Sequence, residues 1–297
     1  MEFGAVRDPR GIDFSLPPLD PRSFGSWPAD PGPFALRTGA PMWGEKSWSG
    51  PFYPEGLPAR GWLRHYATRL PTVEHNGTFY ATPSPELVAA WVAVTPPEFR
   101  LCPKAPKTVS HVGPWRQDAP RFGAAIAGLG ERLGPTLFQV PPEVGPEHWR
   151  EITQRVRSLG VRAAVEVRHP AFFRDGCLLP EVVDWLGRTG HCAVVTDTPG
   201  QREVLHGSVP GGVLYLRFRT TDGNPADAVR MADWADRMAA LVARGLREAW
   251  VFVHEGTGVG LLLRLHAFQK ALSARLGMPV PPPLLLPPSP RLFPGPT

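Results

Sequence analysis

The chain has few cysteines and no long hydrophobic run, and both absences exclude whole classes of protein. Its 297 residues include only three cysteines, which lie far apart and form no CxxC pair. Such spacing predicts neither a disulfide framework nor a zinc site, and it fits a reducing cytoplasm. No apolar run approaches the roughly 18 residues of a membrane-spanning helix, so we expect no membrane association. The opening MEFGAVRDPRG has no apolar core, and we expect no signal peptide.

Lysine is scarce as well. Only four of the 32 basic residues are lysines, at positions 46, 104, 107 and 270. The formal net charge is +5, but the sequence has no run of five basic residues, so nucleic acid is not the favoured partner. Because an ammonium and a guanidinium support different chemistry, a lysine at a special position is a candidate functional residue.

What is present is an alternation of short apolar runs and helical patterns. Strands are expected at 35–39, 72–76, 99–104, 136–140, 163–169, 192–197, 213–218 and 249–255. Helices are expected at 58–69, 85–93, 120–132, 146–159, 178–189, 226–244 and 260–276. Eight alternating strands predict an α/β fold with a single TIM-like (β/α) barrel. A flavodoxin-like or Rossmann sheet is the alternative, but no GxGxxG follows the first strand.

Both ends of the chain are rich in proline. Residues 1–34 hold seven prolines and residues 279–297 hold nine, which favours extended or disordered arms. We therefore divide the chain into an N-terminal arm (1–34), a barrel domain (35–276) and a C-terminal tail (277–297). The tail is expected to lie over the surface, and a polyproline ligand for a partner is the alternative.

Nearly every predicted strand ends in polar side chains. In a barrel the active site forms at the carboxyl ends of the strands, so these side chains are expected to share one mouth. The candidates are Glu74, Asn76, Lys104, Gln139, Glu166, Arg168, His169, Asp197, Arg217, Arg219, His254 and Glu255. Taken singly, each has a structural reading: Glu166 and Arg168 as a buried ion pair, Glu74 as a solvated carboxylate, Lys104 as a surface lysine. As a set they favour function, because burying many charges together is costly.

The two-residue period of a strand sorts these candidates by face. Val73 should face the helices, which turns Glu74 and Asn76 inward and leaves His75 on the helix side. By the same alternation Glu166 and Arg168 face inward, as do Tyr215, Arg217 and Arg219. Alternation does not decide the last strand, where Val251 and Val253 oppose Phe252 and His254.

Two loops extend the expected site. Glycines 256, 258 and 260 precede a predicted helix, and with the neighbouring arginines they form a candidate anion site at Gly256 and Gly258; a tight turn is the alternative. The aromatic segment WSGPFYPEGL (48–57) follows the first strand. It is expected either to cover the mouth as a lid or to pack as a hydrophobic plug.

Five blocks of sequence, in order, resemble the YecE-like family, domain of unknown function 72. They are WSGPFYP (48–54), TVEHNGTFYATPSPELVAAW (72–91), PKAPKTVSH (103–111), LGPTLFQVPP (133–142) and AAVEVRHPAFF (163–173). The resemblance covers about residues 35–275, and it implies a TIM-barrel-like fold but no established activity. It supports as motif positions Glu74, Asn76, Thr78, Tyr80, Lys104, His111, Gln139, Glu166, Arg168 and His169.

The chain departs from the family pattern in its last two strands. The family commonly shows a His-Gly pair after the seventh strand, where this chain has Phe218 and Arg219. It tends to place two asparagines at the eighth, where this chain has His254 and Glu255. The resemblance therefore leaves open whether the family's activity is preserved.

The favoured function is an enzyme that acts on a small phosphorylated or carboxylated molecule at the mouth. Glu74 or Glu166 would be the general base, Lys104 the acid or electrostatic stabiliser, and Arg168 and Arg217 would hold the anion. The alternatives are a phosphodiesterase on nucleic acid that uses a divalent metal, and a non-catalytic binding or scaffold protein. The sequence names no cofactor, no dedicated metal site and no oligomeric state.

Overall fold

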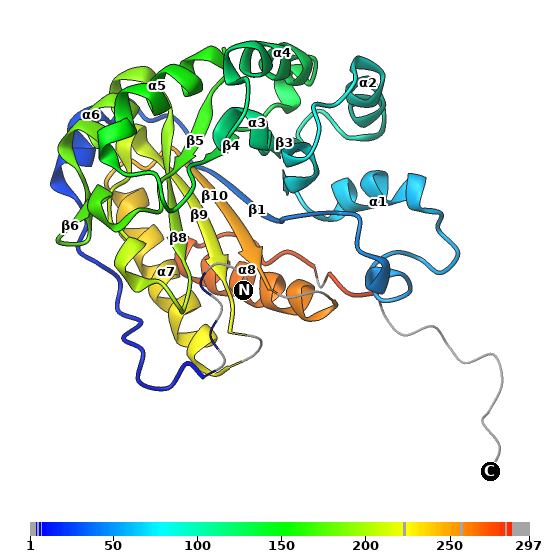
Figure 1. Cartoon of the computed structure of the whole chain (residues 1–297). Helices are drawn as coiled ribbons and strands as arrows, with labels where there is room; N and C mark the ends of the chain where they lie inside the picture. The colour runs from blue at the N-terminus through cyan, green and yellow to red at the C-terminus, as the bar shows by residue number, and fades with distance from the viewer. Residues whose placement is uncertain are drawn as a thin grey trace.

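An eight-stranded parallel sheet, rolled into a nearly closed barrel, forms the centre of the computed structural model (Figure 1). The structure describes residues 4, 6, 8–221, 224–255, 258–282 and 284–286. The barrel strands are β1 (Ala35–Ala40), β2 (Thr72–His75), β3 (Arg100–Pro103), β4 (Thr136–Gln139), β5 (Ala163–Glu166), β8 (Cys192–Asp197), β9 (Val213–Arg219) and β10 (Glu248–His254). The expected TIM-like barrel is confirmed, and each strand starts and ends within three residues of its predicted bounds.

Neighbours in the barrel follow the order of the chain, in the sequence β3-β2-β1-β10-β9-β8-β5-β4. The seam between β3 and β4 is the weak point of closure. Only isolated bridges join the two strands there, at Leu101↔Leu133 and Lys104↔Leu137. The second bridge places Lys104, the first residue after β3, beside Leu137 near the start of β4.

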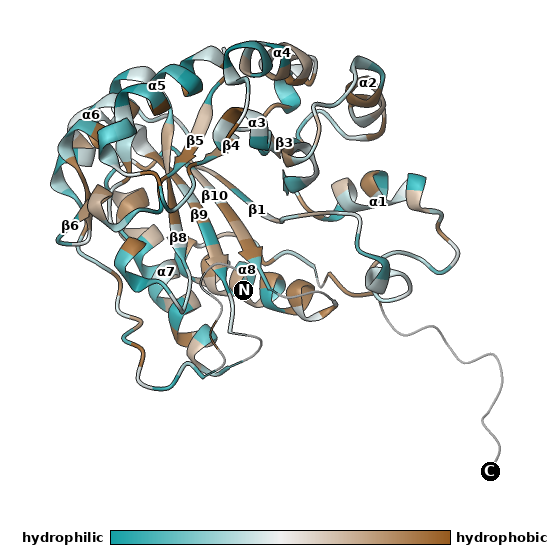
Figure 2. Ribbon diagram, viewed as in Figure 1, coloured by the Kyte–Doolittle hydropathy of each residue, from teal (hydrophilic) through white to brown (hydrophobic). Residues whose placement is uncertain are grey.

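Helices cover the outside of the sheet. They are α1 (Trp62–Arg69), α2 (Pro85–Val94), α3 (Lys107–Ser110), α4 (Trp115–Ala127), α5 (Trp149–Ser158), α6 (Pro180–Thr189), α7 (Ala226–Ala243) and α8 (Gly260–Leu276). A small hairpin of β6 (Phe173–Arg174) and β7 (Cys177–Leu178) precedes α6. Figure 2 shows apolar strands enclosed by helices whose outer faces are largely hydrophilic. Among the described residues, no helix has the length and apolar character needed to cross a membrane.

Helix α4 differs most from the prediction. It begins at Trp115, five residues before the predicted start at Pro120, and it ends at Ala127 rather than near 132. Pro120 therefore lies inside the helix, where its ring removes one backbone hydrogen bond. The helix persists because Ala119, Phe122 and Ile126 are buried in the hydrophobic core, and this packing outweighs the local cost.

The N-terminal arm contributes to the outer layer of the barrel. Residues 198–212, all of them described, connect β8 to β9 without an α-helix, and a 3₁₀ helix of the arm (Pro21–Ser26) packs there beside α6. Buried Asp20 accepts a hydrogen bond from Ser208, and the Trp27 indole donates to the Val209 carbonyl. Gly207 permits this approach, because a Cβ on it would lie 1.9 Å from the Pro18 carbonyl oxygen. The arm thus covers the part of the sheet that this connection leaves without a helix (Figure 1).

Alternation along the strands separates the two faces of the sheet. An apolar layer fills the inside of the barrel, formed by Cys102, Leu137, Ala164, Cys192, Val194, Val213, Tyr215, Trp250 and Phe252. Trp250 and Phe252 belong to it, so His254 also faces inward, which settles the parity that the sequence left open. His75 faces outward as predicted and stacks on Trp43 with the ring centres 4.2 Å apart. Burial lowers the pKa of His75 to about 4, so the imidazole is neutral.

Candidate functional site

A buried carboxylate–guanidinium pair lies at the centre of the barrel mouth. Glu74 is the penultimate residue of β2 and Arg217 lies near the end of β9, two strands that are separated in the barrel by β1 and β10. The Arg217 Nε and Nη2 each donate to a different Glu74 oxygen at 3.0 Å. The hydroxyl of Tyr215 donates to Glu74 Oε2 at 3.0 Å from one layer below. Glu74 is completely buried, so this carboxylate is the floor of the mouth.

Glu166 at the end of β5 is the second buried carboxylate, and it receives four hydrogen bonds. Its Oε2 accepts from the Gln139 amide at 2.6 Å and from Arg217 Nη1 at 2.9 Å. Its Oε1 accepts from Arg168 Nε at 2.8 Å and from the Thr196 hydroxyl at 2.9 Å. Arg217 therefore bridges both carboxylates, and all three of its guanidinium nitrogens donate in doing so.

Lys104 follows β3 and differs from the other cations of the mouth. Its Nζ donates to the Gln139 Oε1 at 3.0 Å and lies 4.4 Å from the centre of the Phe79 ring. Among the described residues, no carboxylate oxygen lies within ion-pair distance of this ammonium. Thr78 fixes the backbone here, because its hydroxyl donates to the Lys104 carbonyl and accepts from the Lys104 N–H. The lysine thus reaches the carboxylate network only through Gln139.

Burial and charge shift the pKa values of these groups in opposite directions. Burial alone would raise the pKa of Glu74, but Arg217 and His254 outweigh it and hold that pKa far below its usual range. For Glu166 burial also opposes ionisation, yet Arg168 and Arg217 lower the pKa to about 2. Burial, with help from Arg217, lowers the pKa of Lys104 to about 8. Both carboxylates are therefore ionised at neutral pH, while Lys104 is close to its titration point.

Because the pKa of Glu166 is lowered in the folded protein, the free energy of unfolding should depend on pH in the acid range. A carboxylate with a lowered folded-state pKa contributes stability above the unfolded pKa and loses it as the pH falls through the folded value. We expect Glu166 to contribute about 3 kcal/mol at pH 7, lost mainly between pH 4 and pH 2. Urea denaturation of the wild type and Glu166→Gln across this range tests it. The variant should show a flatter pH dependence, and an identical slope in both proteins would contradict the assignment.

The structure brings several further predicted residues into this network. The Asn76 side-chain amide donates to Glu74 Oε1 at 3.2 Å and to the Pro41 carbonyl. His254 Nε2 lies 3.3 Å from the same Glu74 oxygen, and burial, with Arg217, lowers the pKa of this imidazole. Arg219 follows Arg217 on the same face of β9 and lies opposite His254 in the strand register. Two of the departures from the family pattern, Arg219 and His254, therefore lie at this mouth, whereas Phe218 faces outward and packs on Phe268 of α8.

Asp197 is a correction to the predicted site. The inward residues of β8 are Cys192, Val194 and Thr196, so Asp197 faces outward toward α7. There it accepts hydrogen bonds from Arg230 at 2.7 Å and from the Trp234 indole at 2.6 Å, and it also pairs with Arg202. Strand parity, which the prediction did not apply to this strand, explains the difference. The buried carboxylate joins β8 to α7 and does not reach the mouth.

Tyr80, His169 and Gly258 were also predicted, and none of them makes a hydrogen bond or ion pair to the buried carboxylates. Tyr80 is 86% exposed and contacts Phe79 at the outer rim. His169 caps the short 3₁₀ turn after β5, since its Nδ1 accepts from the Ala171 N–H at 3.2 Å. Gly256 lies outside the described residues. Gly258 has a left-handed φ of +109°, and its carbonyl accepts from the Trp48 indole at 3.0 Å.

The predicted anion loop begins beside a carboxylate. A Cβ placed on Gly260, the first residue of α8, would lie 2.7 Å from Glu255 Oε1. A negative charge already occupies the space beside this helix start, which disfavours a second anion there. The tight-turn alternative fits this part of the loop better than the anion site.

The aromatic loop after β1 packs as a plug. Trp48, Phe52 and Tyr53 have no exposed surface, and the Trp48 and Phe52 rings meet edge to face at 5.6 Å. Tyr53 stacks on Trp62 at the start of α1, with the ring centres 5.0 Å apart. These contacts join the loop to α1 and to the loop after β10, which favours the hydrophobic plug over the lid.

Thr196 and Tyr215 contact the buried carboxylates although they were not among the predicted site residues. Both could have been found by parity, since Thr196 shares the inward face of β8 and Tyr215 that of β9. The position of Phe79 beside the Lys104 ammonium depends on the turn that follows β2. That turn is a 3₁₀ helix whose geometry has no periodic signal in the sequence.

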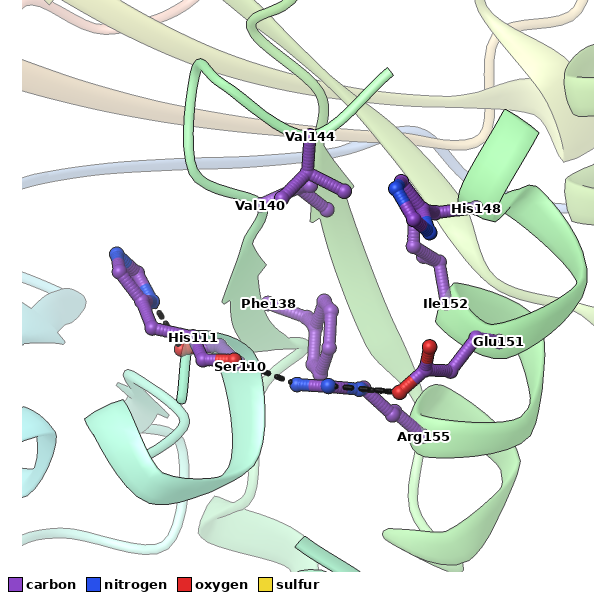
Figure 3. Close-up of a pocket in the computed structure, with 9 residues that line it drawn as sticks. All are labelled: Ser110, His111, Phe138, Val140, Val144, His148, Glu151, Ile152 and Arg155. Carbon is purple, nitrogen blue, oxygen red and sulfur yellow. Dashed lines mark hydrogen bonds and ion pairs between the residues drawn. The ribbon is translucent and has the colours of Figure 1, made fainter. Parts of the chain in front are cut away.

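A second hollow lies outside the barrel, between α3, β4 and α5 (Figure 3). It has a volume of about 160 Å³ and an apolar floor of Phe138, Val140 and Ile152. At its edge Arg155 donates to Glu151 and to the His111 carbonyl, both at 2.8 Å. Since these charged groups satisfy each other, the hollow offers apolar contact rather than charge to a ligand.

The mouth is a poor metal site in its present chemistry. Within the described part of the chain, no three His, Cys, Asp or Glu side chains converge in a way that could hold a metal ion. Glu74 and Glu166 direct their oxygens at guanidinium, amide and hydroxyl donors instead. This donor set does not support the metal-dependent phosphodiesterase alternative.

Comparison with known proteins agrees with the architecture. The model of the family described as "Protein of unknown function DUF72" matches residues 37–284. The chain belongs to this family. The YecE protein of Escherichia coli K12 is 34% identical over 143 residues, which are 46% of this chain and 50% of YecE. The chain thus spans about half the length of the curated relatives it matches.

Solved DUF72 structures show the same fold. A DUF72 protein of Enterococcus faecalis V583 matches with a TM-score of 0.65 at 19% identity, covering 81% of this chain and 98% of that one. A DUF72 protein of Thermotoga maritima MSB8 matches with a TM-score of 0.61 at 26% identity, covering 80% and 99%. These DUF72 structures establish the barrel and assign no chemistry to it.

Proposed function

We propose that this DUF72 protein is an enzyme that binds a small phosphorylated or carboxylated molecule at the barrel mouth and uses Lys104 to transfer a proton. The observation that carries the proposal is the state of Lys104. It is the cation of the mouth with no carboxylate partner among the described residues, and its pKa is about 8. A group with a pKa near the working pH is the most effective proton donor and acceptor.

The charge balance of the mouth supports an anionic substrate. Within the network that Arg217 and Gln139 connect, Glu74 and Glu166 supply two negative charges, whereas Arg168, Arg217 and Lys104 supply three positive charges when the lysine is protonated. An excess positive charge in a buried site is costly unless an anion accompanies it. A phosphate or carboxylate bound beside Lys104 would balance this charge and raise the pKa of the ammonium.

The two carboxylates are better suited to positioning than to proton transfer. A carboxylate with a pKa near 2 is too weak a base to remove a proton efficiently at neutral pH, which argues against the predicted general-base role of Glu166. Glu166 instead holds Arg168 and, through Gln139, orients Lys104. Arg217 is occupied by both carboxylates, so Arg168 and Lys104 are the cations we assign to the substrate anion.

Lys104 chemistry is tested by a turnover screen of phosphorylated and carboxylated metabolites with the wild type, Lys104→Met and Lys104→Arg. For a substrate found with the wild type, kcat/KM should depend on a group of pKa near 8, and kcat should fall about 100-fold or more in Lys104→Met. Lys104→Arg keeps the charge but cannot release its proton at this pH. It should therefore retain binding without restoring kcat.

Lys107→Met is the matched control, because Lys107 is an exposed lysine three residues further along the chain. It should turn over the substrate like the wild type. Wild-type turnover that persists in Lys104→Met would refute the role of Lys104. Thermal stabilisation by a metabolite with no turnover in any protein would favour a binding protein over an enzyme.

A further inference from the structure

The opposite end of the barrel holds a second concentration of positive charge. A hollow of about 590 Å³ opens at the amino ends of the strands. Four arginines line it: Arg37 on β1, Arg100 at the start of β3, Arg162 just before β5 and Arg247 just before β10. Glu248 is the only carboxylate among its lining residues. The lining therefore carries three more positive than negative charges.

Pairing within this hollow leaves two of the four arginines, Arg37 and Arg100, without a carboxylate partner among the described residues. Glu248 pairs with Arg162 at 3.0 Å and with Arg247 at 3.4 Å, and it also accepts from the Trp250 indole. Arg100 donates to the backbone carbonyls of Pro97 and Phe99. Arg37 makes no hydrogen bond or ion pair to any described residue, although its guanidinium lies 4.8 Å from the centre of the Trp250 ring.

Arg37 is held in this position against electrostatic cost. Burial and the neighbouring Arg100 both lower its pKa, which means that its surroundings oppose the charge it carries. Stacking on an aromatic face recovers only part of the hydration free energy that a guanidinium loses on burial. A half-buried cation that is repelled by Arg100 and makes no hydrogen bond to a described residue has its donors available to a ligand.

The hollow is separate from the mouth. The apolar layer that includes Cys102, Val194 and Phe252 fills the barrel between the two ends. Trp250, under Arg37, precedes the mouth residue His254 by four positions on β10, which corresponds to roughly 13 Å along the strand. A ligand in the hollow would not contact the substrate-binding residues.

We infer that this hollow binds the diphosphate group of a small molecule. Guanidinium groups bind phosphate oxygens through paired hydrogen bonds, and a diphosphate supplies the two to three negative charges that the lining lacks. Arg37 and Arg100 are the arginines free of a carboxylate partner, and they make the principal contacts. Arg162 and Arg247, oriented by Glu248, complete the ring of charge.

Inorganic pyrophosphate is the probe, and isothermal titration calorimetry at low salt is the measurement. We expect Arg37→Gln to weaken pyrophosphate binding at least about tenfold, because it removes a charge-assisted contact. Arg188→Gln is the matched control, since this exposed residue near the end of α6 lies at the same end of the barrel and its loss changes the net charge equally. It should bind pyrophosphate within about twofold of the wild type. Lys104→Met should also bind like the wild type, which separates this hollow from the mouth.

Thermal stability distinguishes a ligand-binding role of Arg37 from a purely structural one. If Arg37 only stabilises the fold, Arg37→Gln should melt at a lower temperature than the wild type. If Arg37 is an unpaired, repelled charge kept for a ligand, the substitution should leave the melting temperature unchanged or raise it. Arg100→Gln, which should also weaken binding, tests the site from another strand.

Three results would overturn the inference. They are the absence of pyrophosphate binding to the wild type, equal weakening in Arg37→Gln and Arg188→Gln, and loss of binding in Lys104→Met alone. Orthophosphate binding as tightly as pyrophosphate would overturn the diphosphate assignment.

Discussion

Replacing Arg217 by methionine should destabilise the protein by about 3–5 kcal/mol at pH 7, since it leaves two buried carboxylates without their shared partner. Glu74 has no exposed surface and Glu166 is 1% exposed, so water cannot replace the lost guanidinium. Urea denaturation followed by circular dichroism measures the change. Arg64→Met, at an exposed position of α1, is the control and should change stability by no more than about 0.5 kcal/mol.

The same substitution in a variant without the two carboxylate charges identifies the cause of this loss of stability. In the double variant Glu74→Gln/Glu166→Gln the carboxylate charges are absent, so adding Arg217→Met should cost much less than it does in the wild type. Equal costs in the two backgrounds would mean that Arg217 acts through packing and that the ion network is not what holds the mouth together.

Replacing Trp48 by alanine should cost about 3–5 kcal/mol, because a fully buried indole leaves a large cavity when it is removed. The variant also loses the hydrogen bond to the Gly258 carbonyl, and with it a link between the loops after β1 and β10. Thermal and urea denaturation measure the loss. Trp48→Phe should recover part of it by refilling the space between Phe52 and Tyr53.

Tyr80→Ala is the control for this experiment, since it removes an aromatic ring that is 86% exposed and should be nearly neutral for stability. The hydrophobic plug predicts a large loss of stability in Trp48→Ala with unchanged ligand affinity in the fraction that remains folded. A small loss of stability with much weaker ligand binding would instead support the interpretation of this loop as a lid.

The buried network reconciles two interpretations that the sequence left as alternatives. Glu166 and Arg168 do form an ion pair, as the structural reading held, and Glu74 is likewise fully paired. The same pairing positions Gln139, and through it Lys104, whose ammonium lacks such a partner. The two structural carboxylates and the titratable lysine are therefore parts of one network, in which Glu74 and Glu166 determine the electrostatic environment of the Lys104 ammonium.

Parity was the most informative element of the sequence, and its limits are equally clear. It placed Glu74, Glu166 and Arg217 on the inside of the barrel, where the structure has them. Asp197 was included because it ends a strand, and the same rule applied to β8 would have excluded it. The last strand could not be assigned because apolar residues occupy both of its faces, as expected for a parallel strand buried on both sides.

The N-terminal arm shows what local sequence signals do not contain. Seven prolines in residues 1–34 predicted an extended segment, and nothing local indicated what it would contact. Its partners around Ser208 and Val209 lie more than 180 positions away. The connection from β8 to β9 has no α-helix of its own, and only the folded barrel brings the arm to that gap.

The sequence by itself determined the alternation of strands and helices in this protein and, for strands with one apolar face, which side chains face inward, because hydrophobic period and strand parity are local properties of the chain. It also determined the chemistry available at the strand ends. Tertiary structure alone decided which charges neutralise each other. Arg217 pairs with carboxylates 143 and 51 positions away, while Lys104 and Arg37 are left without an acidic partner. The reason is physical: the pairing of buried charges depends on distances across the closed barrel, and those distances exist only once the eight strands have come together.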